Sequence, residues 1–211
     1  MMDTKEKMPG CPVRLGMFGG TFSPPHRGHI AAALAFRDAL SLDLVTVIPA
    51  GQPPHKTADP GANAADRLAM TRLAFAGVSG VEVSDMEIRR EGRSYTSDTL
   101  AALAAPGREL FLLCGSDMFL TLGTWHEPQR IFSLATVAWV RRENEPETLE
   151  KLLKQEEIYR QNFDARTVPV PLPVREVSSS QVRDAVRAGA DISSWVTPQV
   201  ASYIRERRLY L

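Results

Sequence analysis

Apolar and polar positions along the chain alternate between the spacing typical of strands and the spacing typical of helices. Short apolar or β-branched runs that end at Gly, Pro or polar residues predict strands, and longer segments with apolar residues at helical spacing predict helices. We expect strands at 13–18, 42–48, 81–88, 110–114, 135–140 and 167–170. We expect helices at 63–77, 97–105, 144–161 and 180–188, with others beginning at Ile30 and Thr197.

Strands that alternate with helices favour an α/β fold. We therefore expect a Rossmann-like, doubly wound parallel sheet with helices on both faces, followed by a C-terminal helical part at 178–211. The 211 residues suit one domain with a substantial core, preceded by a polar lead-in at 1–12. That lead-in lacks the apolar core of a signal peptide, and no apolar run approaches a membrane span. We expect a cytoplasmic protein that contacts no membrane.

Charge and cysteine content narrow the classes of partner and site. Lys and Arg total 25, as do Asp and Glu, so no overall positive field attracts nucleic acid. Cys11 and Cys114 lie about a hundred residues apart and form no zinc or C-x-x-C spacing. Cys114, at the end of an apolar run, is expected to be a small buried residue.

The segment at 16–29 is the most informative one in the chain. An apolar run breaks into a Gly/Pro-rich turn containing His26 and His29, after which a helical pattern begins. Glycines let the backbone approach a phosphate, and a helix start presents free N–H groups and a positive dipole end. Two histidines three positions apart at that junction can face one anion. The plain alternative is that both histidines only cap the helix.

Other phosphate-binding patterns do not fit this turn. There is no G-x-G-x-x-G after the strand and no G-x-x-x-x-G-K-[ST]. The residues instead match G-x-F-x-P-x-H-x-G-H, and on this motif the chain resembles the nucleotidylyltransferase superfamily. The match is long and mixed in residue type, which disfavours a purely structural role for the two histidines.

Other polar segments follow predicted strands or begin predicted helices. In parallel α/β sheets ligands bind outside the carboxyl ends of the strands, so such segments are site candidates. Each also has an ordinary structural explanation as a loop, a helix cap or a core aromatic residue. The candidate segments are 49–56 with PPHK, 94–100 with SYTSDTL, 115–117 with GSD, 125–126 with WH, and 177–183 with VSSSQVR.

Taken in order, these segments resemble the bacterial nicotinate-nucleotide adenylyltransferase family over residues 13 to about 208. The resemblance implies transfer of the adenylyl group of ATP to nicotinate mononucleotide, giving nicotinate adenine dinucleotide and pyrophosphate. It also implies a need for Mg²⁺, held mainly by the substrate phosphates, and no covalent enzyme intermediate. We assign no protein ligand to the metal.

The same resemblance implies a role for each matching residue. His26, His29 and Arg183 are the expected catalytic residues, because the departing pyrophosphate needs charge stabilisation more than a nucleophile. The expected ATP-binding residues are Gly19, Gly20, Thr21, Phe22, His26, Gly28, His29, Gly115, Asp117, Ser179, Ser180 and Arg183. The expected nicotinate mononucleotide-binding residues are His55, Lys56, Tyr95, Thr96, Trp125 and His126, with the Trp125 indole stacking on the pyridine ring.

Three positions depart from the family pattern. Ser23 stands where Asp or Asn is usual, Ala50-Gly51 replaces an Asn-containing turn, and His126 replaces a frequent aromatic residue such as Tyr. Two alternatives stay open: an adenylyltransferase for nicotinamide mononucleotide or phosphopantetheine, and a non-catalytic nucleotide-binding regulator of the same fold. The sequence does not decide the oligomeric state, and a homo-oligomer is compatible with it.

Overall fold

The computed structural model describes residues 12–52, 61–141, 146–172 and 177–211. Its centre is a six-stranded sheet, β3-β2-β1-β4-β5-β6, in which every neighbouring pair is parallel. The strands are β1 (Val13–Gly20), β2 (Leu44–Pro49), β3 (Val81–Val83), β4 (Arg108–Gly115), β5 (Ala135–Val140) and β6 (Thr167–Pro169). The chain order reverses between β1 and β4, which is the doubly wound arrangement that the alternating pattern predicts.

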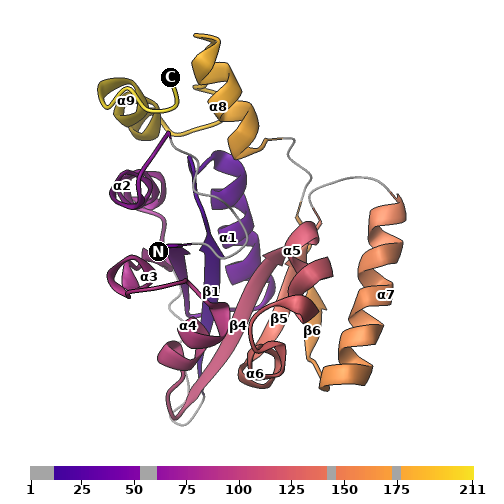
Figure 1. Cartoon of the computed structure of the whole chain (residues 1–211). Helices are drawn as coiled ribbons and strands as arrows, with labels where there is room; N and C mark the ends of the chain where they lie inside the picture. The colour runs from indigo at the N-terminus through magenta and orange to yellow at the C-terminus, as the bar shows by residue number, and fades with distance from the viewer. Residues whose placement is uncertain (1–11, 53–60, 142–145, 173–176) are drawn as a thin grey trace, which may run out of the picture.

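Helices cover both faces of this sheet (Figure 1). The longer ones are α1 (Arg27–Ala39), α2 (Ala64–Phe75), α4 (Thr96–Leu103), α7 (Pro146–Phe163), α8 (Ser179–Arg187) and α9 (Pro198–Glu206). Shorter ones are α3 (Met86–Arg89), α5 (Ser116–Thr121), α6 (Pro128–Leu134) and a 3₁₀ turn, η1 (Leu122–Thr124). No described helix is long and apolar enough to cross a membrane.

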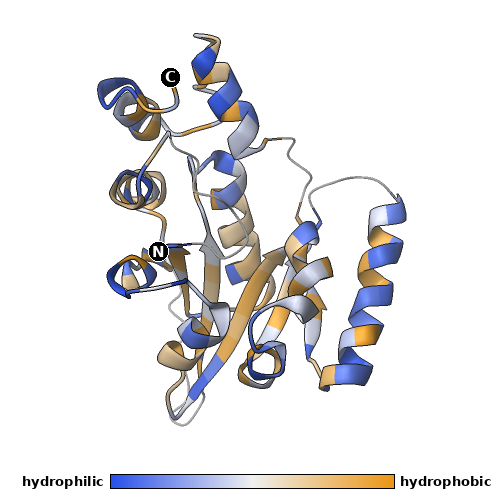
Figure 2. Ribbon diagram, viewed as in Figure 1, coloured by the Kyte–Doolittle hydropathy of each residue, from blue (hydrophilic) through white to orange (hydrophobic). Residues whose placement is uncertain are grey.

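Each face of the sheet has its own buried core. Alternate strand residues such as Phe111 and Leu113 pack with α1, α2, α8 and α9, whereas Leu112 and Cys114 pack with α4, α5, α6 and α7. This division follows from the two-residue period of a strand. The apolar colouring of the strands between helices with polar outer surfaces shows the same layers (Figure 2). Because both faces are covered, the strands are nearly continuous apolar runs.

Close packing of α1 on β1 fixes the start of the candidate site. A Cβ at Gly16 would lie 2.6 Å from the Phe36 ring and 2.7 Å from the Leu42 side chain, so only glycine fits here. The helix therefore lies close to the sheet, directly after the loop that leaves β1. Its first helical residue is Arg27, three residues before the predicted start at Ile30.

Two sequence expectations need correction or refinement. The strand predicted at 81–88 ends at Val83, and the rest forms the short helix α3; the alternating pattern there was wrongly read as one long strand. The helix predicted at 144–161 is α7. Its many charged residues suggest a solvated surface helix, yet its Leu152 and Tyr159 are fully buried. The short helices α5 and α6 were not predicted, because few of their residues show an apolar period.

The C-terminal helices pack over the loop that follows β1. Ser178 and Thr197 cap α8 and α9 through their side chains, as the serine-rich and Thr-Pro starts predict. Arg27 N–H donates to the Trp195 carbonyl at 2.7 Å, which ties the start of α1 to the segment between these helices. The two helices lie together at the top of the molecule in Figure 1. They thereby complete one wall of the site.

Candidate active site

His26 and His29 lie at the N-terminus of α1, as the motif predicts. His26 is the N-cap residue, and the two imidazole rings stack with their centroids 3.7 Å apart. The backbone N–H of His26 donates to Nδ1 of His29 at 3.1 Å. This bond requires an unprotonated Nδ1, so neutral His29 carries its proton on Nε2. The pair thus has a fixed orientation, with the His29 Nε2–H as a donor.

Apolar contacts hold this pair from below. Phe22 is 2 % exposed and has a left-handed backbone, φ 50°, which turns its ring back under the loop. The ring makes edge contacts with His29 at 5.0 Å and with Phe18 at 5.4 Å. Gly28 lies against the His26 ring, and a Cβ there would lie 2.9 Å from Nδ1. Phe22 and Gly28 therefore act here by shaping the support for the histidines.

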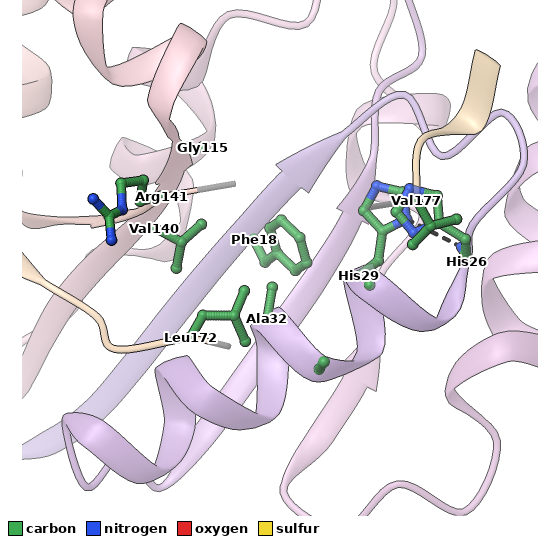
Figure 3. Close-up of a pocket in the computed structure, with 11 residues that line it drawn as sticks. Phe18, His26, His29, Ala32, Gly115, Val140, Arg141, Leu172 and Val177 are labelled. Atoms are coloured by element: carbon green, nitrogen blue, oxygen red, sulfur yellow. Dashed lines mark hydrogen bonds between the residues drawn. The ribbon is translucent and has the colours of Figure 1, made fainter. Parts of the chain in front are cut away.

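A pocket extends from the histidines toward the ends of β4 and β5 (Figure 3). His26 and His29 lie at one end of the close-up, and Val140 and Arg141 lie at the other. Most of the remaining lining is apolar: Phe18, Gly28, Ala31, Ala32, Gly115, Leu172 and Val177. Apolar surface here lies beside paired imidazoles at a helix start, where the positive dipole end favours anions. Its place, between β1 and β4, is the topological switch point of the sheet.

Sequence reasoning missed part of this lining. Arg141 directly follows β5, so the rule about carboxyl ends of strands could have identified it. Leu172 follows the short strand β6 in the same way. Val177 begins the candidate segment 177–183, but the site residues expected there are Ser179, Ser180 and Arg183, so its side chain was not predicted to line the pocket.

The start of α8 docks onto the β1–α1 loop through the residues singled out in the SSSQVR segment. Ser179 Oγ donates to the Pro24 carbonyl at 2.9 Å, and Arg183 Nη1 donates to the Ser23 carbonyl at 2.8 Å. Arg183 Nη2 also donates to Ser180 Oγ at 3.1 Å. These contacts bring Ser179, Ser180 and Arg183 from a distant part of the chain to residues 21–26, the β1–α1 segment that we call the histidine loop. In this structure Ser179 Oγ and both terminal nitrogens of Arg183 therefore donate to oxygens of the protein itself.

Ser23, the first departure from the family pattern, points away from a phosphate role. It is 4 % exposed, and its hydroxyl forms a hydrogen bond with the Tyr210 hydroxyl at 3.1 Å. The side chain thus joins the loop to the C-terminal segment, and Tyr210 is itself buried. A serine here serves the packing of the loop.

The residues predicted to bind the acceptor meet at the other side of the sheet's end. Tyr95 is the N-cap of α4, and Thr96 is its first helical residue. The Tyr95 and His126 rings stack with centroids 4.1 Å apart, which joins the start of α4 to the segment before α6. Trp125 is half-buried and packs against the core on this face, and its indole N–H donates to Thr121 Oγ1 at 3.4 Å.

The Trp125 backbone N–H is engaged inside its own turn, where it donates to the Leu122 carbonyl at 3.1 Å. Among the described residues, no partner contacts the His126 N–H. The family resemblance implies that the backbone around Trp125 and His126 contacts the nicotinate carboxylate. Of these two N–H groups, that of His126 is the one without a partner among the described residues. The third departure from the family pattern, His126, thus changes the side chain that stacks on Tyr95 and leaves the backbone N–H unchanged.

A buried polar cluster supports this side of the site. Glu87 is 4 % exposed, and Thr99 Oγ1 donates to its carboxylate at 2.6 Å. Arg90 Nη2 donates to Thr99 Oγ1 at 2.9 Å. Burial raises the pKa of Glu87, against the smaller lowering effects of Thr99, Arg90 and the adjacent Ser94. No motif pointed to Glu87, because a single acidic residue in a polar stretch has no distinctive pattern.

The remaining predicted residues lie at strand ends. Gly19 and Gly20 end β1, and Thr21 begins the loop that follows. The Thr21 carbonyl accepts a hydrogen bond from Arg67. Gly115 ends β4, and Asp117 is exposed in the first turn of α5. His55 and Lys56 lie outside the described residues.

Cys114, at the same strand end, is 3 % exposed and behaves as the small buried residue that its pattern predicts. Burial raises its pKa to about 12. A thiol in this state is not a nucleophile.

Two comparisons with known sequences bear on this site. Residues 17–185 match the family described as cytidylyltransferase-like. A probable nicotinate-nucleotide adenylyltransferase from Desulfatibacillum aliphaticivorans is 38 % identical to this chain, covering 94 % of it and all of the relative. One from Chromobacterium violaceum is 39 % identical, covering 94 % of this chain and 99 % of the relative.

Solved structures agree in fold. A nicotinic acid mononucleotide adenylyltransferase of Plasmodium falciparum, complexed with NaAD, superposes with a TM-score of 0.73 at 17 % identity, covering 93 % of this chain and 97 % of the other. At that identity the likeness concerns the fold. The sequence matches, which cover nearly the whole chain and include the histidine loop and the docked helix α8, go further: the chain belongs to the nicotinate-nucleotide adenylyltransferase family of nucleotidyltransferase enzymes.

Proposed function

We propose that this enzyme transfers the adenylyl group of ATP to nicotinate mononucleotide, a step of NAD biosynthesis that gives nicotinate adenine dinucleotide and pyrophosphate. The observation that carries the proposal is the stacked pair of His26 and His29 at the start of α1, beside an apolar pocket. The family membership of the chain supports the choice of substrates.

In this reaction an oxygen of the acceptor's phosphate forms a bond to the α-phosphorus of ATP. The bond from that phosphorus to the pyrophosphate oxygen breaks, and negative charge grows on the leaving group. We propose that the Nε2–H of His29 meets that charge, together with the positive end of the α1 dipole. The adenine base is assigned to the apolar surface that runs from the histidines toward Val140 and Arg141.

Arg183 has a second part in this scheme. Its guanidinium holds the histidine loop through the Ser23 carbonyl, so α8 fixes the loop while presenting a cation to it. Ser179 assists through the Pro24 carbonyl. We propose that Arg183 stabilises the leaving pyrophosphate and that Ser179 and Ser180 hold the phosphates from the same side.

The acceptor is assigned to the walls formed by α4 and the segment before α6. Thr96 at the start of α4 and the N–H of His126 suit a carboxylate, which prefers backbone N–H groups at a helix start. Trp125 lies beside them, and its exposed part offers a surface for a pyridine ring. The ribose hydroxyls are assigned to Asp117.

In this proposal Mg²⁺ binds together with the nucleotide. No group of three or more His, Cys, Asp or Glu that could bind a metal occurs in the described ranges. Mg²⁺ usually keeps several waters and binds substrate phosphates, so it needs no protein cage. Bound in that way, Mg²⁺ would neutralise charge on the phosphates. The protein's part is then to orient those phosphates through the histidine loop.

The test is release of pyrophosphate from ATP in the presence of nicotinate mononucleotide, nicotinamide mononucleotide or phosphopantetheine, each in a separate assay. We expect kcat/KM for nicotinate mononucleotide to exceed that for the amide at least about tenfold, which is about 1.4 kcal/mol of discrimination. Equal rates on both mononucleotides would refute the carboxylate contacts. No pyrophosphate with any acceptor would support a non-catalytic nucleotide-binding protein.

A further inference from the structure

Arg67, which no motif singled out, lies buried between the two loops that follow β1 and β2. It belongs to α2 and is 3 % exposed. Its Nη1 donates to the Thr21 carbonyl at 2.9 Å, and its Nη2 donates to the Gly51 carbonyl at 3.2 Å. Thr21 belongs to the histidine loop, and Gly51 to the start of the loop that follows β2. One guanidinium therefore holds both loops.

This contact continues the ladder between β1 and β2 past its end. The last backbone bond between the two strands' ends runs from the Ala50 N–H to the Gly20 carbonyl at 2.9 Å. One residue further along each chain, the carbonyls of Thr21 and Gly51 are joined through Arg67 instead. Beyond the ends of β1 and β2 the guanidinium therefore bridges the two segments.

The contact also reaches the start of α4. Ser94 Oγ accepts from the N–H of Gly51 at 2.9 Å and from the N–H of Gln52 at 3.2 Å. Ser94 directly precedes Tyr95 and Thr96, where the acceptor is expected. A continuous hydrogen-bonded path thus runs from Thr21 through Arg67 and Gly51 to Ser94. It joins the nucleotide side of the site to the acceptor side.

Arg67 occupies this place at an energetic cost. Among the described residues no carboxylate forms an ion pair with Arg67. Its neighbour Asp66 instead accepts from the Tyr203 hydroxyl at 3.0 Å and from Arg207 at 3.4 Å. Burial lowers the pKa of Arg67. A buried cation bound only to neutral carbonyls is unfavourable unless its geometry is needed, and only arginine offers rigid donors on two nitrogens at this spacing.

We propose that Arg67 is a positioning residue that fixes the histidine loop and, through Gly51 and Ser94, the start of α4 at the separation required for adenylyl transfer. The inference rests on the proposed function, because the histidine loop is assigned to ATP and the start of α4 to the mononucleotide. If the proposal holds, replacing the Arg67 guanidinium, which donates from two nitrogens, impairs the alignment of the two substrates more than the binding of either one alone.

The test compares Arg67→Lys and Arg67→Gln with a matched control on the same helix. Arg72→Gln changes an arginine that is more than half exposed and pairs with Asp85 on the surface. Each protein is assayed for kcat, for thermal unfolding, and for binding of α,β-methylene-ATP and nicotinate mononucleotide separately and together. We expect both Arg67 variants to lose at least about thirtyfold in kcat, and each separate Kd to change less than about threefold. The control should match wild type.

A second variant addresses the path from its other end and guards against unfolding of the Arg67 variants. Ser94→Ala removes the acceptor for the two loop N–H groups and leaves Arg67 in place. We expect the same pattern at reduced size, about a tenfold loss in kcat with separate binding retained. Unaltered kcat in Ser94→Ala, recovery of wild-type kcat in Arg67→Lys, or a loss confined to the Kd of one substrate would each overturn the proposal.

Failure of the proposed function would look different. In that case wild type would release no pyrophosphate with nicotinate mononucleotide. Binding would still decide the role of Arg67: tighter binding of the mononucleotide when α,β-methylene-ATP is present, lost in Arg67→Lys and kept in Arg72→Gln, supports it. Equal coupling in all three proteins refutes it.

Discussion

Gly28→Ala tests whether the packing around His26 controls catalysis. A Cβ at position 28 would lie 2.9 Å from His26 Nδ1 and 3.1 Å from Val177 Cγ1, where ordinary contact begins at 3.4 Å. The His26 ring must therefore move by about 0.5 Å, and its 3.7 Å stack on His29 passes the shift on. Since a misplacement of about 1 Å can cost about a hundredfold in rate, we expect about a tenfold loss in kcat/KM for ATP.

Stability should change in another way. Replacing a helical glycine by alanine gains up to about 1 kcal/mol in helix propensity, which offsets the crowding at His26. We expect the Tm of Gly28→Ala to stay within a few degrees of wild type. The matched control is Ala35→Gly on the same helix, which should lose about 1 kcal/mol of stability and keep wild-type kinetics. Wild-type kcat/KM for ATP in a folded Gly28→Ala would refute the inference that the His26 ring must be held in place.

Three further predictions concern single side chains. If the indole stacks on the pyridine, Trp125→Ala should weaken acceptor binding by about 1–3 kcal/mol and leave the KM for ATP unchanged. Equal loss of affinity for both substrates, with a lower Tm, would make Trp125 a core residue. His29→Ala should lower kcat by about 10²–10³ in steady-state assays, and near-normal kcat would make the motif structural. The difference in Tm between Glu87→Gln and wild type should shift in favour of the variant as the pH is raised from 4 to 8. Burial raises the pKa of Glu87, so its stabilising contribution is complete below its unfolded pKa and is lost as the pH rises through the folded value, while glutamine stays neutral.

The convergence of the site could be predicted because it depends on topology. Alternating strands and helices predict a parallel sheet, and the carboxyl ends of parallel strands meet at one edge. That rule places Gly20, Gly115 and the histidine loop together without any knowledge of side-chain contacts. It also covers Arg141, which follows β5 and lines the pocket. The rule was available for Arg141, but no motif drew attention to that position.

Contacts that depend on packing could not be predicted in the same way. The alternation at 81–88 matches a strand, yet the pairing partner β2 ends at Pro49, and the chain turns into α3 after Val83. Arg67 lies on an ordinary helix pattern, and only the folded chain shows that its two acceptors come from different loops. The spacing of apolar residues predicts which face of a helix a residue occupies. It does not predict which loop packs against that face.

The position of Arg183 shows how a motif can be right about proximity and leave the role open. The sequence predicts a cation near the phosphates, and the structure brings Arg183 to the histidine loop, where it donates to the Ser23 carbonyl and to Ser180 Oγ. A lysine would keep the charge but could not donate along both directions, because its ammonium is a compact point charge. If Arg183→Lys recovers kcat, the charge alone matters. If kcat stays low while the Kd for ATP is retained, the fork that holds the loop is the feature that the reaction requires.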